Sequence, residues 1–221
     1  MANWFLGRAL AEEAEAENAA WSFLGEGAAF WVTVAVLLVA GVAVYLVTRK
    51  KSSKKSFWTA KTMAVGAMCM ALSSVLSLIK LWSMPMGGSV TPASMLPLLL
   101  FAYCYGVGPG MVLGALYGVM QFVLDGGAWA ALGLIPNLLD YPIAFGLLGL
   151  AGCFRGSKAK MTAGFVLGCF GRFMASFLSG FIFYGQYAPE GVNPVWYSLT
   201  YNGSYMLVEC IICIALGLLV G

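Results

Sequence analysis

Long apolar runs alternate with short polar segments over most of the chain. Six such runs follow residue 57, and they cover about residues 58–81, 95–107, 110–124, 132–153, 161–183 and 196–220. A helix that crosses a bilayer needs about 20 mostly apolar residues. The pattern therefore predicts an all-α membrane protein with a bundle of six transmembrane helices. The second and third runs are short for full spans.

A seventh apolar run lies near the N-terminus. Residues 1–29 are polar and acidic, and residues 30–48 are rich in Val, Ala and Leu and predict one additional transmembrane helix. The basic sequence RKKSSKK follows at 49–55. We therefore expect residues 1–60 to form an acidic segment, an extra helix and a basic linker. Residues 61–221 would form the six-helix substrate-binding membrane domain.

The loop charges predict the topology in the cell membrane. Lys and Arg are enriched in cytoplasmic loops, which places residues 49–55 and the sequence RGSKAK (155–160) inside. Alternation then places the loops at 82–93, 125–130 and 186–194 outside. Both ends of the six-helix core would lie in the cytoplasm, and the extreme N-terminus outside.

Composition narrows the function further. The chain is 61% hydrophobic and 10% charged, with a mean hydropathy of +0.87 and a net charge of +3, which gives no reason to expect nucleic acid as a partner. It contains no histidine, and no metal-ligand cluster is evident, so we expect neither an enzyme nor a metal or cofactor. The pair Cys210 and Cys213 lies in an apolar run and is interpreted as packing. ATP-driven work would come from partners, because the chain has no room for a nucleotide-binding domain.

The stretch 172–209 has the pattern of a binding site. It contains two apolar runs joined by the polar loop 186–194, and aromatic and amide side chains gather around this loop: Tyr184, Tyr187, Trp196, Tyr197, Tyr201, Asn202 and Tyr205. Aromatic residues also serve as plain anchors at membrane interfaces. Here they accompany ionisable groups deeper in the runs. This combination favours the wall of a site for a flat, polar small molecule.

Three ionisable residues fall inside predicted spans: Asp140, Arg172 and Glu209. A carboxylate near the middle of a bilayer costs about 3 kcal/mol, so Asp140 should face a cavity or a partner. Helical spacing places Asn137, Asp140 and Tyr141 on one face. An acid beside aromatic rings suits a planar cation, and Asn202 can pair with a heterocycle. The alternative is an internal ion pair of Arg172 with Glu209 or Asp140.

Two further features allow two interpretations each. The loop 81–95, with the glycine pair at 87–88, is either a lid over an outward-facing pocket or a connector. Ala67 and Ala71 lie four residues apart in the first run of the core. Small residues at this spacing either pack helices within the bundle or present a surface to another membrane protein.

Three segments carry a resemblance to a known family. They are MPMGGSVTPASMLPLLLFAYCYGVGPG (84–110), LLDYPIAFGLLGLAG (138–152) and SGFIFYGQYAPEGVNPVWYSLTYNGSYM (179–206). They resemble the thiamine-specific substrate-binding component of energy-coupling factor transporters, over about residues 61–221. The resemblance implies a six-helix bundle that captures thiamine outside the cell. It also implies a transmembrane coupling protein and two cytoplasmic ATPases as partners.

The resemblance assigns roles to individual positions. Binding residues of the family match Asp140, Tyr141, Gly180, Tyr197 and Asn202. Other positions depart from the pattern or are candidates. Ser176 and Tyr184 stand where some members have histidine and tryptophan, and some members have glutamate in place of Asp140. Trp82 is the candidate for a first-loop tryptophan. Ala67 and Ala71 match the family motif that meets the coupling protein.

The predicted function is therefore a high-affinity thiamine-binding subunit of an ATP-driven importer. Its expected substrate-binding residues are Asp140, Tyr141, Ser176, Gly180, Tyr184, Tyr197, Asn202, Trp82 and Asn137. The alternative is a stand-alone secondary transporter for a cationic heterocycle or amine, with Asp140 and Glu209 as proton-coupling groups.

Overall fold

The computed structural model describes residues 59–84, 88–125, 134–189 and 192–220 of the 221-residue chain. The predicted acidic segment, the additional helix at 30–48 and the basic linker at 49–55 lie outside the described residues.

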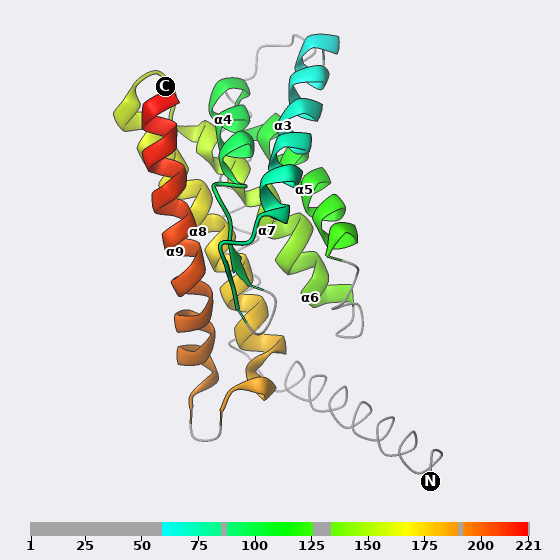
Figure 1. Cartoon of the computed structure of the whole chain (residues 1–221), viewed down its shortest axis with the longest axis vertical. Coiled ribbons are helices and arrows are strands. Elements are labelled where there is room, and N and C mark those ends of the chain that lie inside the picture. Colours follow the sequence, from blue (N-terminus) through cyan, green and yellow to red (C-terminus); the bar gives the residue numbers. More distant parts are fainter. Residues whose placement is uncertain (1–58, 85–87, 126–133, 190–191, 221) are drawn as a thin grey trace. The chain divides into compact units, whose positions relative to one another are not determined.

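The described residues are mostly helical, which confirms the predicted all-α class (Figure 1). The elements before the broken fourth span are α3 (Ala60–Leu78), the short strands β1 (Trp82–Ser83) and β2 (Ser89–Val90), α4 (Leu96–Tyr105) and α5 (Val107–Leu124). The fourth span consists of α6 (Leu134–Leu138), the π-helical turn η2 (Leu139–Ile143), α7 (Ala144–Leu147) and the 3₁₀ segment η3 (Leu148–Cys153). The chain continues with α8 (Lys158–Phe183), the 3₁₀ turn η4 (Gly185–Tyr187) and α9 (Pro194–Val220).

Each of the six predicted core spans contains helix. Within the described residues, five segments are long and apolar enough to cross a membrane: α3, α5, the segment Ile135–Cys153, α8 and α9. The second predicted span holds only the ten-residue α4, which is too short to cross a bilayer by itself. The helix ends at Gly106, whose φ of +104° is not accessible to most other residues.

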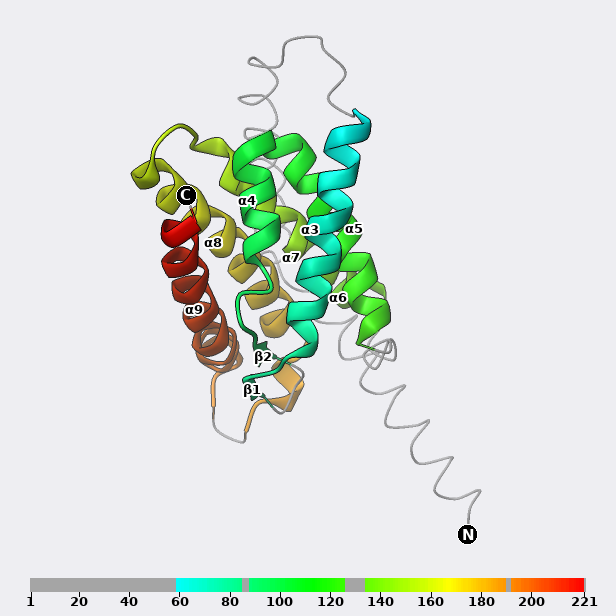
Figure 2. The same cartoon turned by 45° about the horizontal axis from the view of Figure 1, so that its top comes forward.

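The short helix α4 lies in the core of the bundle. Its Leu98, Leu99 and Phe101 are buried, as are Leu148 of η3 and Phe165 of α8. The long helices α8 and α9 lie side by side in both views (Figures 1 and 2). α3 is mostly exposed, and Ala67 and Ala71 are among its exposed residues. The buried core therefore lies on the α4, α5 and α8 side of this helix.

Glycines allow α5 to touch the broken span backbone to backbone. A Cβ at Gly118 would lie 2.8 Å from the Cα of Pro142 and would collide with the Tyr141 carbonyl. A Cβ at Gly114 would collide in the same way with the Phe145 carbonyl. Glycine ridges of this kind permit close helix packing in membranes. The contact fixes the position of η2 against α5.

The segment between α3 and α4 differs from the expected external loop. β1 and β2 form an antiparallel pair that joins Trp82 to Val90, at the end of the bundle where α8 ends (Figure 2). The chain then enters the bundle, because Thr91, Ser94 and Met95 are buried. Part of the predicted loop is thus inside the protein.

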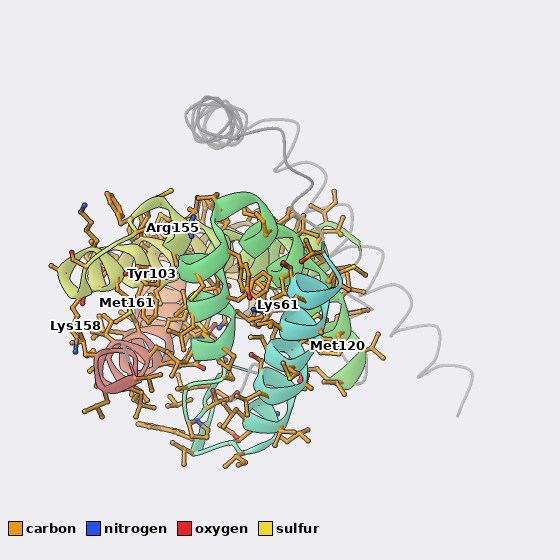
Figure 3. The ribbon with its side chains drawn as sticks, turned by 90° about the horizontal axis from the view of Figure 1, so that it is seen from above. Lys61, Tyr103, Met120, Arg155, Lys158 and Met161 are labelled. Atoms are coloured by element: carbon orange, nitrogen blue, oxygen red, sulfur yellow. The ribbon has the colours of Figure 1, made fainter. Side chains whose placement is uncertain are left out.

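The opposite end of the bundle carries basic side chains. Lys61, Arg155 and Lys158 lie at the end where α3 and α8 begin (Figure 3). Ser157 caps α8 by accepting a hydrogen bond from the Lys160 amide at 3.3 Å.

Candidate ligand-binding site

A cavity lies among α3, α5, η2, α8, α9 and the segment before α4. Seven of the nine predicted site residues line it: Asp140, Tyr141, Ser176, Gly180, Tyr184, Tyr197 and Asn202. The other two do not line it. Trp82 of β1 is 68% exposed, and Asn137 of α6 is buried outside the lining. The structure therefore brings together side chains from three spans that are distant in sequence.

Asp140 reaches the cavity from a distorted turn of the fourth span. Pro142 cannot donate an amide hydrogen bond, and it lies inside the π-helical turn η2 with Asp140 and Tyr141. Turns of this type are frequent at functional sites. The Asp140 carboxylate accepts a hydrogen bond from Ser179 Oγ of α8 at 2.7 Å. A carboxylate oriented by a hydroxyl group can accept hydrogen bonds from a ligand or balance a positive charge on it.

The Asn202 amide is held by neighbouring protein groups. Its Nδ2 lies 3.1 Å from the Ser198 carbonyl and 3.3 Å from the Ser176 carbonyl, and its Oδ1 accepts from Tyr205 Oη at 3.0 Å. Gly180 faces this amide, and a Cβ there would lie 2.9 Å from Asn202 Nδ2 and would collide with Ser198 Oγ. A heterocycle that pairs with Asn202, as predicted, would therefore have to share the amide with these hydrogen-bond partners or displace them.

Tyrosine rings form one wall of the cavity. Tyr197 and Tyr201 stack with centroids 6.0 Å apart and an interplanar angle of 28°, and Tyr201 and Tyr205 meet edge to face at 6.0 Å. The ring of Tyr184, just beyond the end of α8, lies near that of Tyr187, with centroids 6.4 Å apart. Burial raises the pKa of Tyr184 well above its ordinary value, so its hydroxyl group remains a hydrogen-bond donor at neutral pH. Such rings can stack on a planar ligand and attract a cation.

Arg172 and Glu209 lie in the same cavity and form the ion pair that the sequence left open. Arg172 Nη1 is 4.0 Å from Glu209 Oε2, and the guanidinium carbon lies 4.1 Å from the centre of the Phe145 ring. Glu209 Oε1 accepts hydrogen bonds from Thr91 at 2.5 Å and from Ser94 at 2.8 Å. Glu209 therefore holds the segment before α4 as well as Arg172.

Further residues line the cavity. Four of them lie in the loop 81–95, for which a lid over the pocket was one of the two interpretations: Gly88, Ser89, Thr91 and Ser94. Sequence reasoning missed the others, which are Ser77, Lys80, Tyr117, Gln121, Asp125, Phe145 and Ser198. The lining thus contains three carboxylates (Asp125, Asp140 and Glu209) and two basic groups (Lys80 and Arg172), a formal excess of one negative charge.

Comparison with known proteins places the chain in a family. A family model described as "Thiamine transporter protein (Thia_YuaJ)" matches residues 63–220. The chain belongs to this thiamine transporter family. The matched region includes every described element from α4 to α9, and all residues named above as lining the cavity lie within it.

Two individual relatives of the chain agree with the family assignment. The chain is 39% identical over 145 residues to "Thiamine transporter ThiT" of Bacillus subtilis, a match that covers 59% of this chain and 73% of the relative. It is 34% identical over 134 residues to the protein of the same name from Lacticaseibacillus paracasei, with 54% and 67% covered. Both relatives carry the name of a transporter.

The fold is also known from a solved structure. The structure of ThiT from Listeria monocytogenes superposes with a TM-score of 0.63 at 21% sequence identity, covering 72% of this chain and 91% of that protein. This likeness concerns the fold alone. Together with the five membrane-length helices, the family assignment identifies a multi-pass membrane protein.

Proposed function

We propose that this chain binds thiamine in the cavity and serves as the substrate-binding subunit of an ATP-driven thiamine importer. The observation that carries the proposal is the lining itself, in which the Asp140 carboxylate and the tyrosines of α9 share one cavity. Thiamine consists of a positively charged thiazolium ring and an aminopyrimidine ring, two flat heterocycles that a methylene group joins. The carboxylate would balance the thiazolium charge, and the rings would stack on the two heterocycles.

The charge balance of the cavity supports a cation as ligand. Arg172 is already paired with Glu209, and its guanidinium group lies over Phe145. The Asp140 carboxylate accepts a hydrogen bond from the neutral hydroxyl group of Ser179, which does not balance its charge. A buried carboxylate without a cation is unfavourable, and an incoming thiazolium would relieve this cost.

The coupling to ATP hydrolysis is inferred from the family resemblance and from α3. Ala67 and Ala71 are exposed on this helix, next to the exposed apolar side chains of Met63 and Met68. A small-residue stripe on an exposed apolar face fits close approach of another membrane helix. The partner would be the transmembrane coupling protein, which carries two cytoplasmic ATPases.

The orientation follows from the basic end of the bundle. Lys61, Arg155 and Lys158 would lie on the cytoplasmic side (Figure 3). Gly88, Tyr184 and Tyr197 at the opposite end would then open to the outside, where thiamine is captured.

Titration of the purified protein with a panel of vitamins tests the proposal. Thiamine should quench the intrinsic fluorescence of the protein, because tyrosines form one wall of the cavity. The control vitamins biotin and nicotinamide should not quench it. Failure of thiamine to bind would reject the proposed function.

A further inference from the structure

Asp125 is a cavity residue to which the sequence assigned no role. It follows the last residue of α5 and uses both carboxylate oxygens. Oδ2 accepts a hydrogen bond from Tyr141 Oη at 3.1 Å, and Oδ1 accepts one from Gln121 Nε2 at 3.2 Å. The carboxylate therefore joins the end of α5 to the residue that follows Asp140 in η2.

Tyr141 is held at both ends of its side chain. At its backbone, the missing side chain of Gly118 lets α5 contact the Tyr141 carbonyl. At its far end, the hydroxyl group is bonded to Asp125, and the ring lies edge to face on Phe122 with centroids 5.3 Å apart at 72°. A hydrogen bond to a charged acceptor is stronger than one between neutral groups. Asp125 is thus the polar contact that fixes the direction of the ring.

The support of Asp125 reaches into the protein core. Gln121 lies one helical turn before Asp125, and its Oε1 is 3.0 Å from Tyr117 Oη. Tyr117 is fully buried, and its hydroxyl group also lies 3.3 Å from the Ser73 carbonyl of α3. The Asp125 carboxylate is therefore held by a side chain that is itself anchored.

We infer that Asp125 is a positioning residue for ligand binding, which holds the Tyr141 ring against a heterocyclic cation bound at Asp140. The inference rests on the proposed function, because it takes thiamine as that cation. Asp125 acts through Tyr141: without the carboxylate the ring gains rotational freedom, and this freedom must be lost again when the ligand binds.

A double-mutant cycle on thiamine affinity tests the inference. The full-length protein is purified as wild type, Asp125→Asn, Tyr141→Phe and the double variant, and each is titrated with thiamine. Asparagine keeps the shape of the side chain and removes its charge, and phenylalanine keeps the ring and removes its hydroxyl group. We expect each single variant to bind about tenfold more weakly, and the double variant to bind no more weakly than the weaker single variant.

Tyr103→Phe is the matched control. This hydroxyl group lies away from the cavity, 3.5 Å from the Ser157 carbonyl and 3.2 Å from the Gly156 amide. Its loss should leave thiamine affinity unchanged. Melting temperatures of all variants, measured without thiamine, separate a loss of fold from a loss of positioning. A purely structural role of Asp125 would lower the melting temperature, and the affinity losses of Asp125→Asn and Tyr141→Phe would then be independent of each other.

The outcomes distinguish the two claims. Wild type that fails to bind thiamine overturns the proposed function and, with it, this inference. The positioning role alone is overturned if wild type and Asp125→Asn bind thiamine equally well. It is also overturned if the losses of affinity caused by the two substitutions are additive. If Asp125→Asn does not fold, Tyr141→Phe decides by itself, and unchanged affinity in that variant overturns the inference.

Discussion

Thr91 Oγ1, in the segment before α4, lies 2.5 Å from Glu209 Oε1 in the middle of α9 and donates a hydrogen bond to it. Both residues are buried and both line the cavity. The same carboxylate is paired with Arg172 of α8. One acidic side chain thereby connects three parts of the chain that are far apart in sequence, and it does so beside the site where we place the ligand.

Loss of the Thr91 hydroxyl group should destabilise the protein. Thr91→Val keeps the side-chain shape but leaves a buried carboxylate oxygen with one donor fewer, which we expect to cost about 1–3 kcal/mol. Thermal unfolding in detergent measures the effect. Thr200→Val is the control, because that hydroxyl group is exposed and bonds only within its own helix, at 2.7 Å from the Trp196 carbonyl. Equal melting temperatures for the two variants would contradict the role of the bond.

A methyl group at Gly180 should weaken thiamine binding. The Cβ of Gly180→Ala would displace Ser198 and the Asn202 amide, and thereby the lining around Ser176. We expect affinity to fall about tenfold or more, since displacing a packed polar group costs more than 1 kcal/mol. Gly108→Ala in α5 is the matched control, because its Cβ meets nothing within 4 Å. If both variants bound thiamine as tightly as wild type, the predicted displacement of Ser198 and Asn202 by the new methyl group would be contradicted.

A bulky residue on the exposed face of α3 should impair assembly and leave binding intact. Ala67→Trp would block close approach of a partner helix, whereas thiamine affinity should stay at the wild-type value because Ala67 does not line the cavity. Co-purification with the proposed coupling protein and ATPases measures assembly. Leu207→Trp, on α9, is the control for a tryptophan on another exposed face, where leucine is 65% exposed. Normal assembly of the Ala67 variant would argue against this surface.

Single cysteines at the two ends of the bundle should report the orientation. In a background with the native cysteines replaced by serine, Lys158→Cys should react with a membrane-impermeant thiol reagent only after cells are opened. Asn193→Cys should react in intact cells. Both positions are exposed. The reverse pattern would contradict the orientation that we derive from the basic end of the bundle.

Much of the fold was readable from hydropathy, because apolar runs of span length have few alternatives to membrane helices. The short second span was readable too, but the burial of Thr91 and Ser94 before α4 was not, because these residues are polar and resemble loop residues. Their partner, Glu209, lies more than a hundred residues away in sequence. Contacts at such a distance leave no periodic signal.

The candidate site was predictable in part for a similar reason. Asp140 stood out because a carboxylate inside an apolar run needs a cavity or a partner. Asp125 did not, because it follows a span directly, where charged residues are ordinary. Trp82 was selected through the family resemblance, as the candidate for a first-loop tryptophan, but in the pairing of β1 with β2 it is exposed. The direction of a loop side chain depends on this pairing rather than on residue type.

The most direct measurement is the thiamine affinity of Asp140→Asn beside wild type and Asp140→Glu. Asparagine removes the charge that we place next to the thiazolium, and glutamate retains it. We predict that Asp140→Asn binds thiamine about thirtyfold more weakly or worse, while Asp140→Glu stays within about tenfold of wild type. Equal affinity of wild type and Asp140→Asn would contradict the account.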